Sequence, residues 1–176
     1  TRAGLAALGV NYASESKEMV IYVADLRSGE TRSFPLRQGE TQNPFADGVD
    51  TLAIAADGSL LSGSYEGVEQ WDLATGKKTR ACGEPGMGTL GRYSQVAVSA
   101  SGASMIAGCW DGQITTLLVG DSSSAAALRR VTSHGDGVSA VAMDPAGERI
   151  ASGDSSGAVR VGWATGEEPH LLLGHS

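Results

Sequence analysis

The clearest candidates for ligand chemistry are two glycine-rich stretches. Residues 86–91 read GMGTLG, which fits the GxGxxG pattern of dinucleotide-binding loops. That pattern requires a strand before it and a helix after it, whose amino terminus holds the pyrophosphate. Here the following segment, QVAVSA at 95–100, alternates as a strand does. We therefore expect a connection between strands at 86–91 and no nucleotide cofactor.

The second stretch, GKKT at residues 76–79, resembles part of a phosphate-binding loop. The complete loop has a further glycine upstream, at the position where this chain has Trp71. The stretch therefore predicts a turn between two strands.

Residue types that build catalytic and metal sites are present but do not form a recognisable constellation. No serine lies in a GxSxG nucleophile elbow. The histidines are few and regularly placed, which does not suggest a metal site: His134, His170 and His175. Four aspartates lie near predicted turns, where a short carboxylate stabilises a bend by bonding to the backbone: Asp111, Asp136, Asp144 and Asp154. We expect no catalytic, cofactor or metal site.

The two cysteines, Cys82 and Cys109, stand alone, with no CxxC and no histidine at metal spacing. We expect both to be small apolar residues of strands, neither disulfide-bonded nor nucleophilic. Such cysteine usage fits a reducing compartment, so an intracellular, cytoplasmic location is expected.

The charge balance and the hydropathy pattern limit the classes of partner. The net charge is -7, from 13 basic and 20 acidic residues, which disfavours nucleic acid because phosphate binding needs a positive surface. No run approaches the roughly 18 apolar residues of a membrane span, so none is expected.

Glycine spacing reveals the organisation of the chain. Gly is 25 of 176 residues and Pro only 5, which suits short strands joined by glycine turns. Three glycine series repeat in phase: Gly63, Gly108 and Gly153 at intervals of 45; Gly67, Gly112 and Gly157 at the same interval; and Gly58, Gly102 and Gly147 at intervals of 44 and 45. A period in the forties marks a four-stranded propeller blade.

Four strands are predicted in each repeat. Alternating segments for the first strand start at Val49, Gln95 and Val138, and those for the second at Leu60, Met105 and Arg149. The third strand starts at Val68, Ile114 and Ala158, and the less regular fourth at Lys78, Ala127 and His170. A tight glycine turn joins the second strand to the third.

The best-preserved repeat, LSGSYEGVEQWDLATG at 61–76, resembles the heart of a WD40 repeat. Gly63, Gly67, the Trp71-Asp72 ending and Thr75-Gly76 match the family's strand, turn and strand in order. The resemblance implies an all-β fold, a β-propeller of four-stranded antiparallel blades, within a larger ring of about seven blades.

The repeats divide the chain into blades. We expect a partial blade with its second, third and fourth strands at 1–36, complete blades at 37–83, 84–131 and 132–173, and the start of a further blade at 174–176. A blade cannot bury both faces of its sheet alone. The remaining blades are therefore expected from the same, longer chain.

Many WD40 blades carry a buried hydrogen-bonded set of histidine, serine, aspartate and tryptophan. Here the resemblance implies only incomplete sets. The Trp71 blade has Ser62 but Glu66 at its turn, and the next blade places Leu117 at the tryptophan position. The last blade has His134 and Ser152, with Gly162 at the tryptophan position. We expect blades held mainly by packing.

One rim of the propeller is the candidate partner-binding surface. Tyr65 and Trp110 are 45 residues apart, each just before the acidic residue and glycine of a tight turn. In the WD40 family that turn lies beside the loops between blades, which here include Arg92-Tyr93 and His134 to Asp136. Aromatic residues and arginine are common energetic anchors of protein interfaces. The alternative is that both aromatic rings pack against neighbouring turns and cover the blade edges.

The sequence favours a non-catalytic scaffold that binds a protein or peptide within a multiprotein assembly. A ligand- or partner-sensing domain of a larger signalling protein is the alternative, and a purely structural spacer also stays open. A propeller-based enzyme fits less well, because the first strands, DTLAIA, QVAVSA and SAVAM, offer almost no ionisable residue to a central channel. The acidic balance favours a basic partner.

Overall fold

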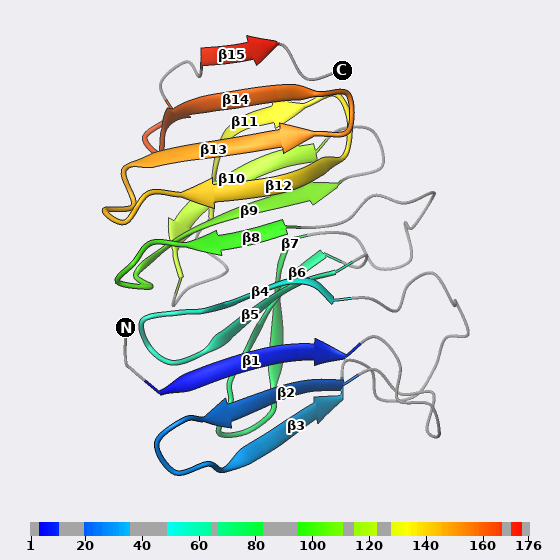
Figure 1. The fold of residues 1–176 in the computed structure, drawn as a ribbon. Helices are drawn as coiled ribbons and strands as arrows, with labels where there is room; N and C mark the ends of the chain where they lie inside the picture. The colour runs from blue at the N-terminus through cyan, green and yellow to red at the C-terminus, as the bar shows by residue number, and fades with distance from the viewer. Residues whose placement is uncertain are drawn as a thin grey trace, which may run out of the picture.

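The computed structural model describes residues 4–10, 20–35, 49–64, 67–82, 95–110, 115–122, 128–166 and 170–173. Every regular element within these ranges is a β-strand, and they contain no helix able to cross a membrane. The strands are β1 (Leu5–Val10), β2 (Val20–Asp25), β3 (Thr31–Pro35), β4 (Val49–Ile54), β5 (Leu60–Ser64), β6 (Gly67–Trp71), β7 (Lys78–Cys82), β8 (Gln95–Val98), β9 (Ser104–Trp110), β10 (Thr115–Asp121), β11 (Arg129–His134), β12 (Val138–Met143), β13 (Arg149–Asp154), β14 (Ala158–Trp163) and β15 (His170–Leu173) (Figure 1).

The strands form separate antiparallel sheets in which each strand pairs with its neighbours in sequence. Sheet I contains β1 to β3, sheet II β4 to β7, sheet III β8 to β11 and sheet IV β12 to β15. Sheets II, III and IV are four-stranded. The predicted all-β fold of four-stranded antiparallel units is thus confirmed, and the alternating segments of the sequence are its strands.

Glycine shapes the first turn of each four-stranded sheet. Gly58, Gly102 and Gly147 follow the first strands of sheets II, III and IV, with φ angles of 88°, 73° and 78°. Residues with a Cβ rarely adopt such positive φ values, whereas glycine does so at little cost. The glycine series seen in the sequence therefore marks equivalent turns.

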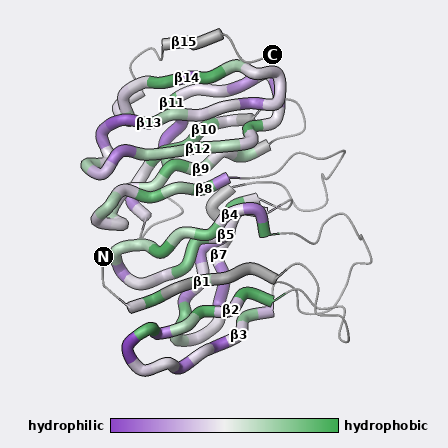
Figure 2. The backbone as a smooth tube through the Cα atoms, viewed as in Figure 1, coloured by the Kyte–Doolittle hydropathy of each residue, from purple (hydrophilic) through white to green (hydrophobic). Residues whose placement is uncertain are grey.

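The sheets stack face to face, with a hydrophobic core in each of the three spaces between them (Figure 1). Between sheets I and II, Ile21 and Val23 pack with Leu60 and Trp71. The second core combines Leu61 and Val68 with Met105 and Ala107, and the third combines Ile106 and Leu117 with Val138 and Ile150. Figure 2 shows hydrophobic stretches along the facing strands and hydrophilic residues toward the turns.

The stack has two distinct edges. β8 contacts both β4 and β12, so the first strands of sheets II to IV lie side by side in that order. The edge at which β5, β9 and β13 end is called the rim, and it lies on the right in Figure 1. The opposite edge, which carries the turns from first to second and from third to fourth strands, is the turn edge.

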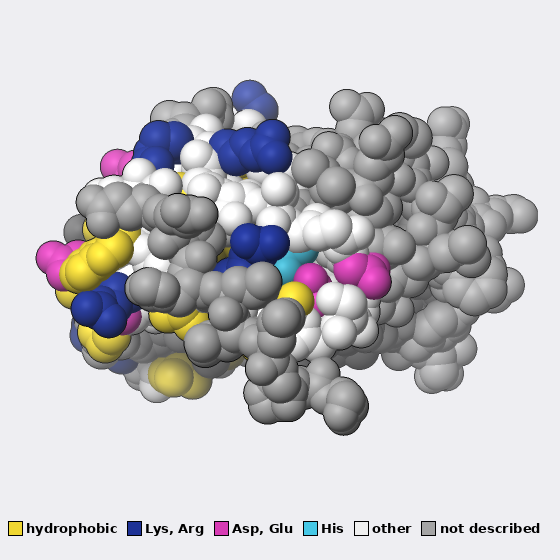
Figure 3. All heavy atoms as spheres, turned by 90° about the horizontal axis from the view of Figure 1, so that it is seen from above, with side chains coloured by type: hydrophobic (Ala, Val, Ile, Leu, Met, Phe, Trp, Pro, Cys, Tyr) yellow, Lys and Arg dark blue, Asp and Glu magenta, His cyan; other side chains and the backbone are white. Residues whose placement is uncertain are grey.

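The outward face of sheet IV is apolar but less covered than its equivalents. Strand pairing places Ala151 and Val159 at the positions of Leu61 and Val68 in sheet II. The sheet II residues are fully buried, whereas Ala151 and Val159 are half-buried. Seen from above, the described part of this side shows hydrophobic side chains together with basic ones (Figure 3).

Candidate functional site

The most connected polar group among the described residues lies where sheets III and IV meet at the rim. His134, the last residue of β11, is only 1% exposed. Its Nδ1 lies 2.8 Å from Asp154 Oδ2, and its Nε2 lies 2.8 Å from Ser152 Oγ. Because an ionised carboxylate only accepts hydrogen bonds, Nδ1 carries a proton and donates it to Asp154. In the neutral ring Nε2 then accepts from the Ser152 hydroxyl.

β13 and the turn that follows it position both partners of the histidine. Ser152 and Asp154 are two residues apart on β13, so both side chains project from the same face of the strand. Asp154 Oδ1 accepts hydrogen bonds from Ser156 N (3.0 Å), Ser156 Oγ (2.6 Å) and Ala158 N (2.9 Å). One carboxylate therefore shapes the turn with one oxygen and holds His134 with the other.

These bonds also set the ionisation of Asp154. Burial alone would raise the pKa of its carboxyl group, but the hydrogen bonds from Ser156, His134 and Ala158 favour the charged form and lower the pKa to about 2. Asp154 is therefore ionised at neutral pH.

The order of serine, histidine and aspartate is that of a hydrolase triad, in which histidine activates the serine. Here Ser152 is only 4% exposed and lies in the contact between two sheets. A nucleophile must reach its substrate, and this hydroxyl cannot. We therefore assign the group a structural role and call it the His134 lock, made of His134, Ser152 and Asp154.

The predicted rim residues are only partly described. Tyr65, Arg92 and Tyr93 lie outside the described residues. The backbone of Trp110 ends β9 at the rim and pairs with Thr115. These positions stay predictions as partner contacts.

The other two predicted rim residues lie together at the start of sheet IV. The prediction that His134 presents its side chain to a partner is wrong, because the His134 lock buries the ring. Asp136, two residues later, is half-buried and accepts a hydrogen bond from Gly137 N at 2.7 Å. Asp136 therefore keeps a partly accessible place at the rim.

A carboxyl group that the sequence did not single out lies at the start of β4. Asp50 falls at the irregularity between Val49 and Thr51 in the pairing of β4 with β5. Partial loss of hydration raises the pKa of Asp50 to about 6, but the residue is exposed to solvent, which weakens such an effect. Among the described residues, no set of three or more His, Cys, Asp or Glu side chains is placed to hold a metal ion.

Comparison with known proteins identifies the repeat that contains the His134 lock. Residues 126–161 match the family described as WD40, "WD domain, G-beta repeat". The family resemblance inferred from the sequence is confirmed, and it is carried by sheet IV with the end of sheet III.

Solved structures share the propeller fold of this chain. A chain from the crystal structure of the mitotic checkpoint complex matches with a TM-score of 0.62 and 18% identity, over 96% of this chain and 47% of that one. TolB from Acinetobacter baumannii matches with a TM-score of 0.62 and 18% identity, over 97% of this chain and 41% of TolB. The chain thus spans less than half the length of both. A sequence search of curated proteins finds no significant match.

The hydrogen-bonded set of WD40 repeats is divided among sheets II, III and IV. Ser152 and Asp154 of sheet IV bond to His134 at the end of sheet III. Sheet IV lacks the tryptophan, because Gly162 pairs with Ile150 as Trp71 pairs with Leu60. The predicted glycine at the tryptophan position is thus confirmed. Sheet II has the remaining contact, in which the buried Trp71 Nε1 donates to Ser62 Oγ at 2.8 Å.

On the described strands β9 and β10 of sheet III, neither the serine nor the tryptophan of sheet II has a counterpart, and Ala107 takes the position of Ser62. Gly120, not Leu117, takes the tryptophan position, because Gly120 pairs with Met105. The physical reason for this correction is a longer hairpin: Trp110 pairs with Thr115, whereas Ser64 pairs with Gly67 in sheet II.

Cys109 corrects the expectation drawn from the cysteines. It lies in register with Asp154 on the 45-residue repeat, and it is disulfide-bonded. The sequence contains one other cysteine, Cys82, at the end of β7. Disulfides persist in oxidising compartments, so the cysteines no longer argue for a cytoplasmic location.

Proposed function

We propose that this WD40 propeller segment is a non-catalytic scaffold that binds a protein or peptide at its rim. The observation that carries the proposal is the place of Trp110 at the end of β9, opposite Thr115. The hairpin between Ser64 and Gly67 is its counterpart in the neighbouring sheet, and Tyr65 lies within it. Two aromatic residues at equivalent hairpins would give a partner two rigid anchors.

The His134 lock supports this proposal by fixing the neighbouring part of the rim. It ties the end of sheet III to the second strand of sheet IV through two short hydrogen bonds. Asp136 and the turn at Asp154 are therefore held on a stiff support. A rigid surface loses little conformational entropy when it binds, and an acidic residue such as Asp136 favours a basic partner.

The outward face of sheet IV supports a further part of the proposal, that additional blades of the same longer chain cover it. Half-buried Val159 and Val161 lie where neighbouring sheets cover the equivalent residues elsewhere in the stack. A place within a multiprotein assembly is also proposed. One structural relative comes from such an assembly, the mitotic checkpoint complex.

The second candidate, an enzyme built on the propeller, is favoured only by Asp50. A carboxyl group with a pKa of about 6 can exchange protons near neutral pH. A test is activity screening with Asp50→Asn as the matched control. Turnover that Asp50→Asn abolishes would replace the scaffold proposal.

The scaffold proposal is tested by replacing both rim aromatics, Tyr65→Ala with Trp110→Ala, and comparing the proteins captured from a lysate by quantitative mass spectrometry. The matched control is Trp163→Ala, because Trp163 is 41% exposed and lies at the opposite edge. We expect the double variant to lose its captured partner by about tenfold or more while the control keeps it. Circular dichroism checks folding. Loss of folding in the double variant would support the packing role of the aromatics instead.

A further inference from the structure

The first turn of sheet II is one residue shorter than its counterparts. Ala55 N donates to Ser59 O, four residues on, whereas Ser99 N donates to Ser104 O and Asp144 N to Arg149 O, each five residues on. The interval of 44 between Gly58 and Gly102, against 45 from Gly102 to Gly147, records the same difference in the sequence. The missing residue is the one after the turn glycine.

That residue closes the turn edge in the longer turns. Ala103 O accepts from Ser122 N at 3.0 Å in sheet III, and Glu148 O accepts from Ala164 N at 2.7 Å in sheet IV. Each bond joins the first turn to the end of the third strand. Sheet II has no corresponding bond between Gly58 O and Leu73 N, although both residues are described. The short turn does not reach the third strand there.

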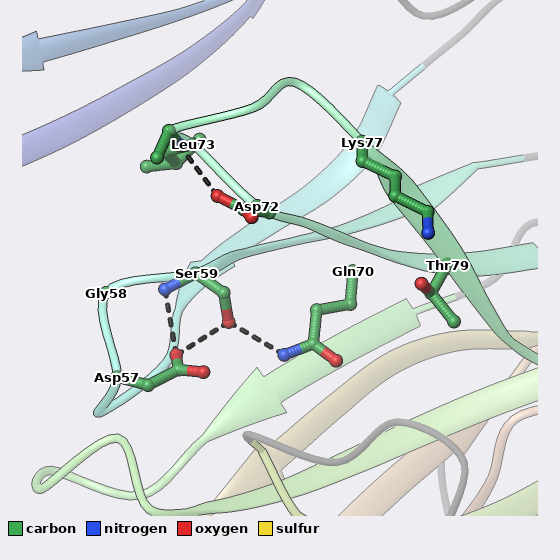
Figure 4. Close-up of a pocket in the computed structure, with 9 residues that line it drawn as sticks. Asp57, Gly58, Ser59, Gln70, Asp72, Leu73, Lys77 and Thr79 are labelled. Carbon is green, nitrogen blue, oxygen red and sulfur yellow. Dashed lines mark hydrogen bonds between the residues drawn. The ribbon is translucent and has the colours of Figure 1, made fainter.

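An open pocket of about 530 Å³ occupies this gap (Figure 4). Its volume falls in the usual range for small-molecule sites. The pocket is lined by the first turn, the end of β6, the turn that follows and β7, through Asp57, Gly58, Ser59, Gln70, Asp72, Leu73, Ala74, Lys77 and Thr79. No aromatic ring lines it, so it offers no stacking surface for a nucleobase or a sugar.

The polar groups on one side of the pocket are held in place. Asp57 Oδ1 accepts from Ser59 N at 2.8 Å and from Ser59 Oγ at 2.7 Å. Gln70 Nε2 donates to Ser59 Oγ at 2.8 Å and to Ser122 O of sheet III at 3.1 Å. Figure 4 shows Asp57, Ser59 and Gln70 joined by these bonds, with Lys77 and Thr79 on the other side. The lining is therefore organised before any ligand arrives.

Two lining residues of the pocket, Gln70 and Asp57, have no amide or charged counterpart in sheets III and IV. Strand pairing puts Val119 in sheet III and Val161 in sheet IV at the position of Gln70. Counted from the turn glycines, Ser101 and Ala146 take the position of Asp57. The fold thus tolerates uncharged residues at both places. The bond to Ser122 O of sheet III accounts for Gln70. No such bond between sheets is formed by the side chains of Asp57 and Lys77 among the described residues.

The charges of the pocket are opposite and separated. Asp57 lies on the first turn and Lys77 on the turn before β7, and Figure 4 places them on different sides. Neither forms an ion pair with another described residue. We propose that the pocket binds a small zwitterion, a free amino acid or dipeptide, whose ammonium group meets Asp57 and Gly58 O and whose carboxylate meets Lys77. This second site lies away from the rim and does not depend on the proposed scaffold function.

Calorimetric titration of the full chain with the common L-amino acids and glycylglycine tests the proposal. We expect saturable binding of at least one of them at one site, and about tenfold weaker binding of butylamine and butyrate, which each carry a single charge. Asp57→Asn keeps an oxygen for the turn but removes the charge, and Lys77→Met removes the other. Each is expected to weaken binding about tenfold or more. The matched control, Asp144→Asn in the equivalent turn of sheet IV, should bind as the unmodified chain does.

A second variant tests the origin of the pocket. One alanine inserted between Gly58 and Ser59 gives the turn the length found in sheets III and IV. We expect the inserted carbonyl to accept from Leu73 N, the pocket to close and binding to be lost, with the thermal midpoint unchanged or raised. If the insertion prevents folding, Asp57→Asn and Lys77→Met decide alone. The proposal is overturned if no member of the panel binds, or if binding survives both charge removals or the insertion in a folded chain.

Discussion

The serine at the same position forms a bond within the sheet in sheet II and a bond to the neighbouring sheet in sheet IV. In sheet II, Ser62 accepts a hydrogen bond from Trp71 on the neighbouring strand of its own sheet. In sheet IV, Ser152 bonds to His134, which belongs to sheet III. The first contact stiffens a single sheet and is neutral. The second joins two sheets and includes the ionised Asp154.

The difference shows that the hydrogen-bonded set of a WD40 repeat can be divided. Each half keeps its serine buried and bonded, with exposures of 1% for Ser62 and 4% for Ser152. A buried hydroxyl without a partner would cost free energy, so either half satisfies the requirement on its own. The two halves should therefore differ in how much unfolding free energy they contribute and in how this contribution depends on pH. They should also act independently of each other.

The His134 lock, which includes the ionised Asp154, is the ionic half. Removing its histidine should lower the unfolding free energy more than any other change considered. His134→Ala leaves Asp154 charged and Ser152 without its acceptor in a buried contact, so we expect a loss of about 3–5 kcal/mol of unfolding free energy. Urea denaturation measures it. Ser133→Ala, a change to the half-buried neighbour, is the control and should stay within about 0.5 kcal/mol. A loss below about 1 kcal/mol for His134→Ala would contradict a lock between the sheets.

The disulfide at Cys109 gives sheet III a covalent link at the position of Asp154. This link should contribute about 3 kcal/mol, because a disulfide restricts the unfolded chain. Reductant should lower the unfolding free energy of the unmodified chain by this amount. Cys109→Ser, which supplies the residue type of Ser64, should start lower and show no response. Equal responses of both proteins would refute the link.

The ionic half should also carry a pH dependence that the neutral half lacks. The folded pKa of Asp154 is lowered to about 2 from 3.8, so its stabilisation is present above about pH 4 and is lost as the pH falls toward 2. The lost free energy is about 2 kcal/mol. Denaturation at stepped pH measures it as the difference from Asp154→Asn, which keeps an oxygen for the turn. A constant difference between the two proteins from pH 5 to pH 2 would contradict this assignment.

Loss of the indole N–H in sheet II should have the smallest effect. Trp71→Phe keeps an aromatic ring in the core but removes the donor to Ser62, so we expect a loss of about 1–2 kcal/mol. The loss should be the same at pH 7 and pH 4, because neither group ionises there. Denaturation at both values decides the point, and a pH-dependent loss would show coupling to a charged group.

Much of the fold could be predicted from the sequence because its signals are local. Glycine spacing identified the turns at Gly58, Gly102 and Gly147, and alternation identified the strands between them. The Trp71-Asp72 ending pointed to the family that residues 126–161 then confirmed. Such features depend on backbone conformation and strand pairing within one repeat, which neighbouring residues largely decide.

The features that the sequence did not predict depend on contacts between distant segments. Asp154 was interpreted as a turn residue, and its second oxygen on His134 requires sheet III to pack against sheet IV. Gly120 replaced Leu117 because hairpin length shifts the pairing. The interval of 44 before Gly102 is visible in the sequence. Its consequence, the pocket, is not, because it depends on the absence of a hydrogen bond from Leu73 N to Gly58 O.

The claim that the two halves act independently is tested most directly by a double-mutant cycle between His134→Ala and Trp71→Phe. The Trp71–Ser62 bond lies within sheet II, the His134 lock joins sheets III and IV, and the two sites share no partner. Urea denaturation of the unmodified chain, both single variants and the double variant gives the coupling free energy. We predict additivity within about 0.5 kcal/mol, and a coupling of about 1 kcal/mol or more would show instead that sheets II and IV are stabilised as one unit.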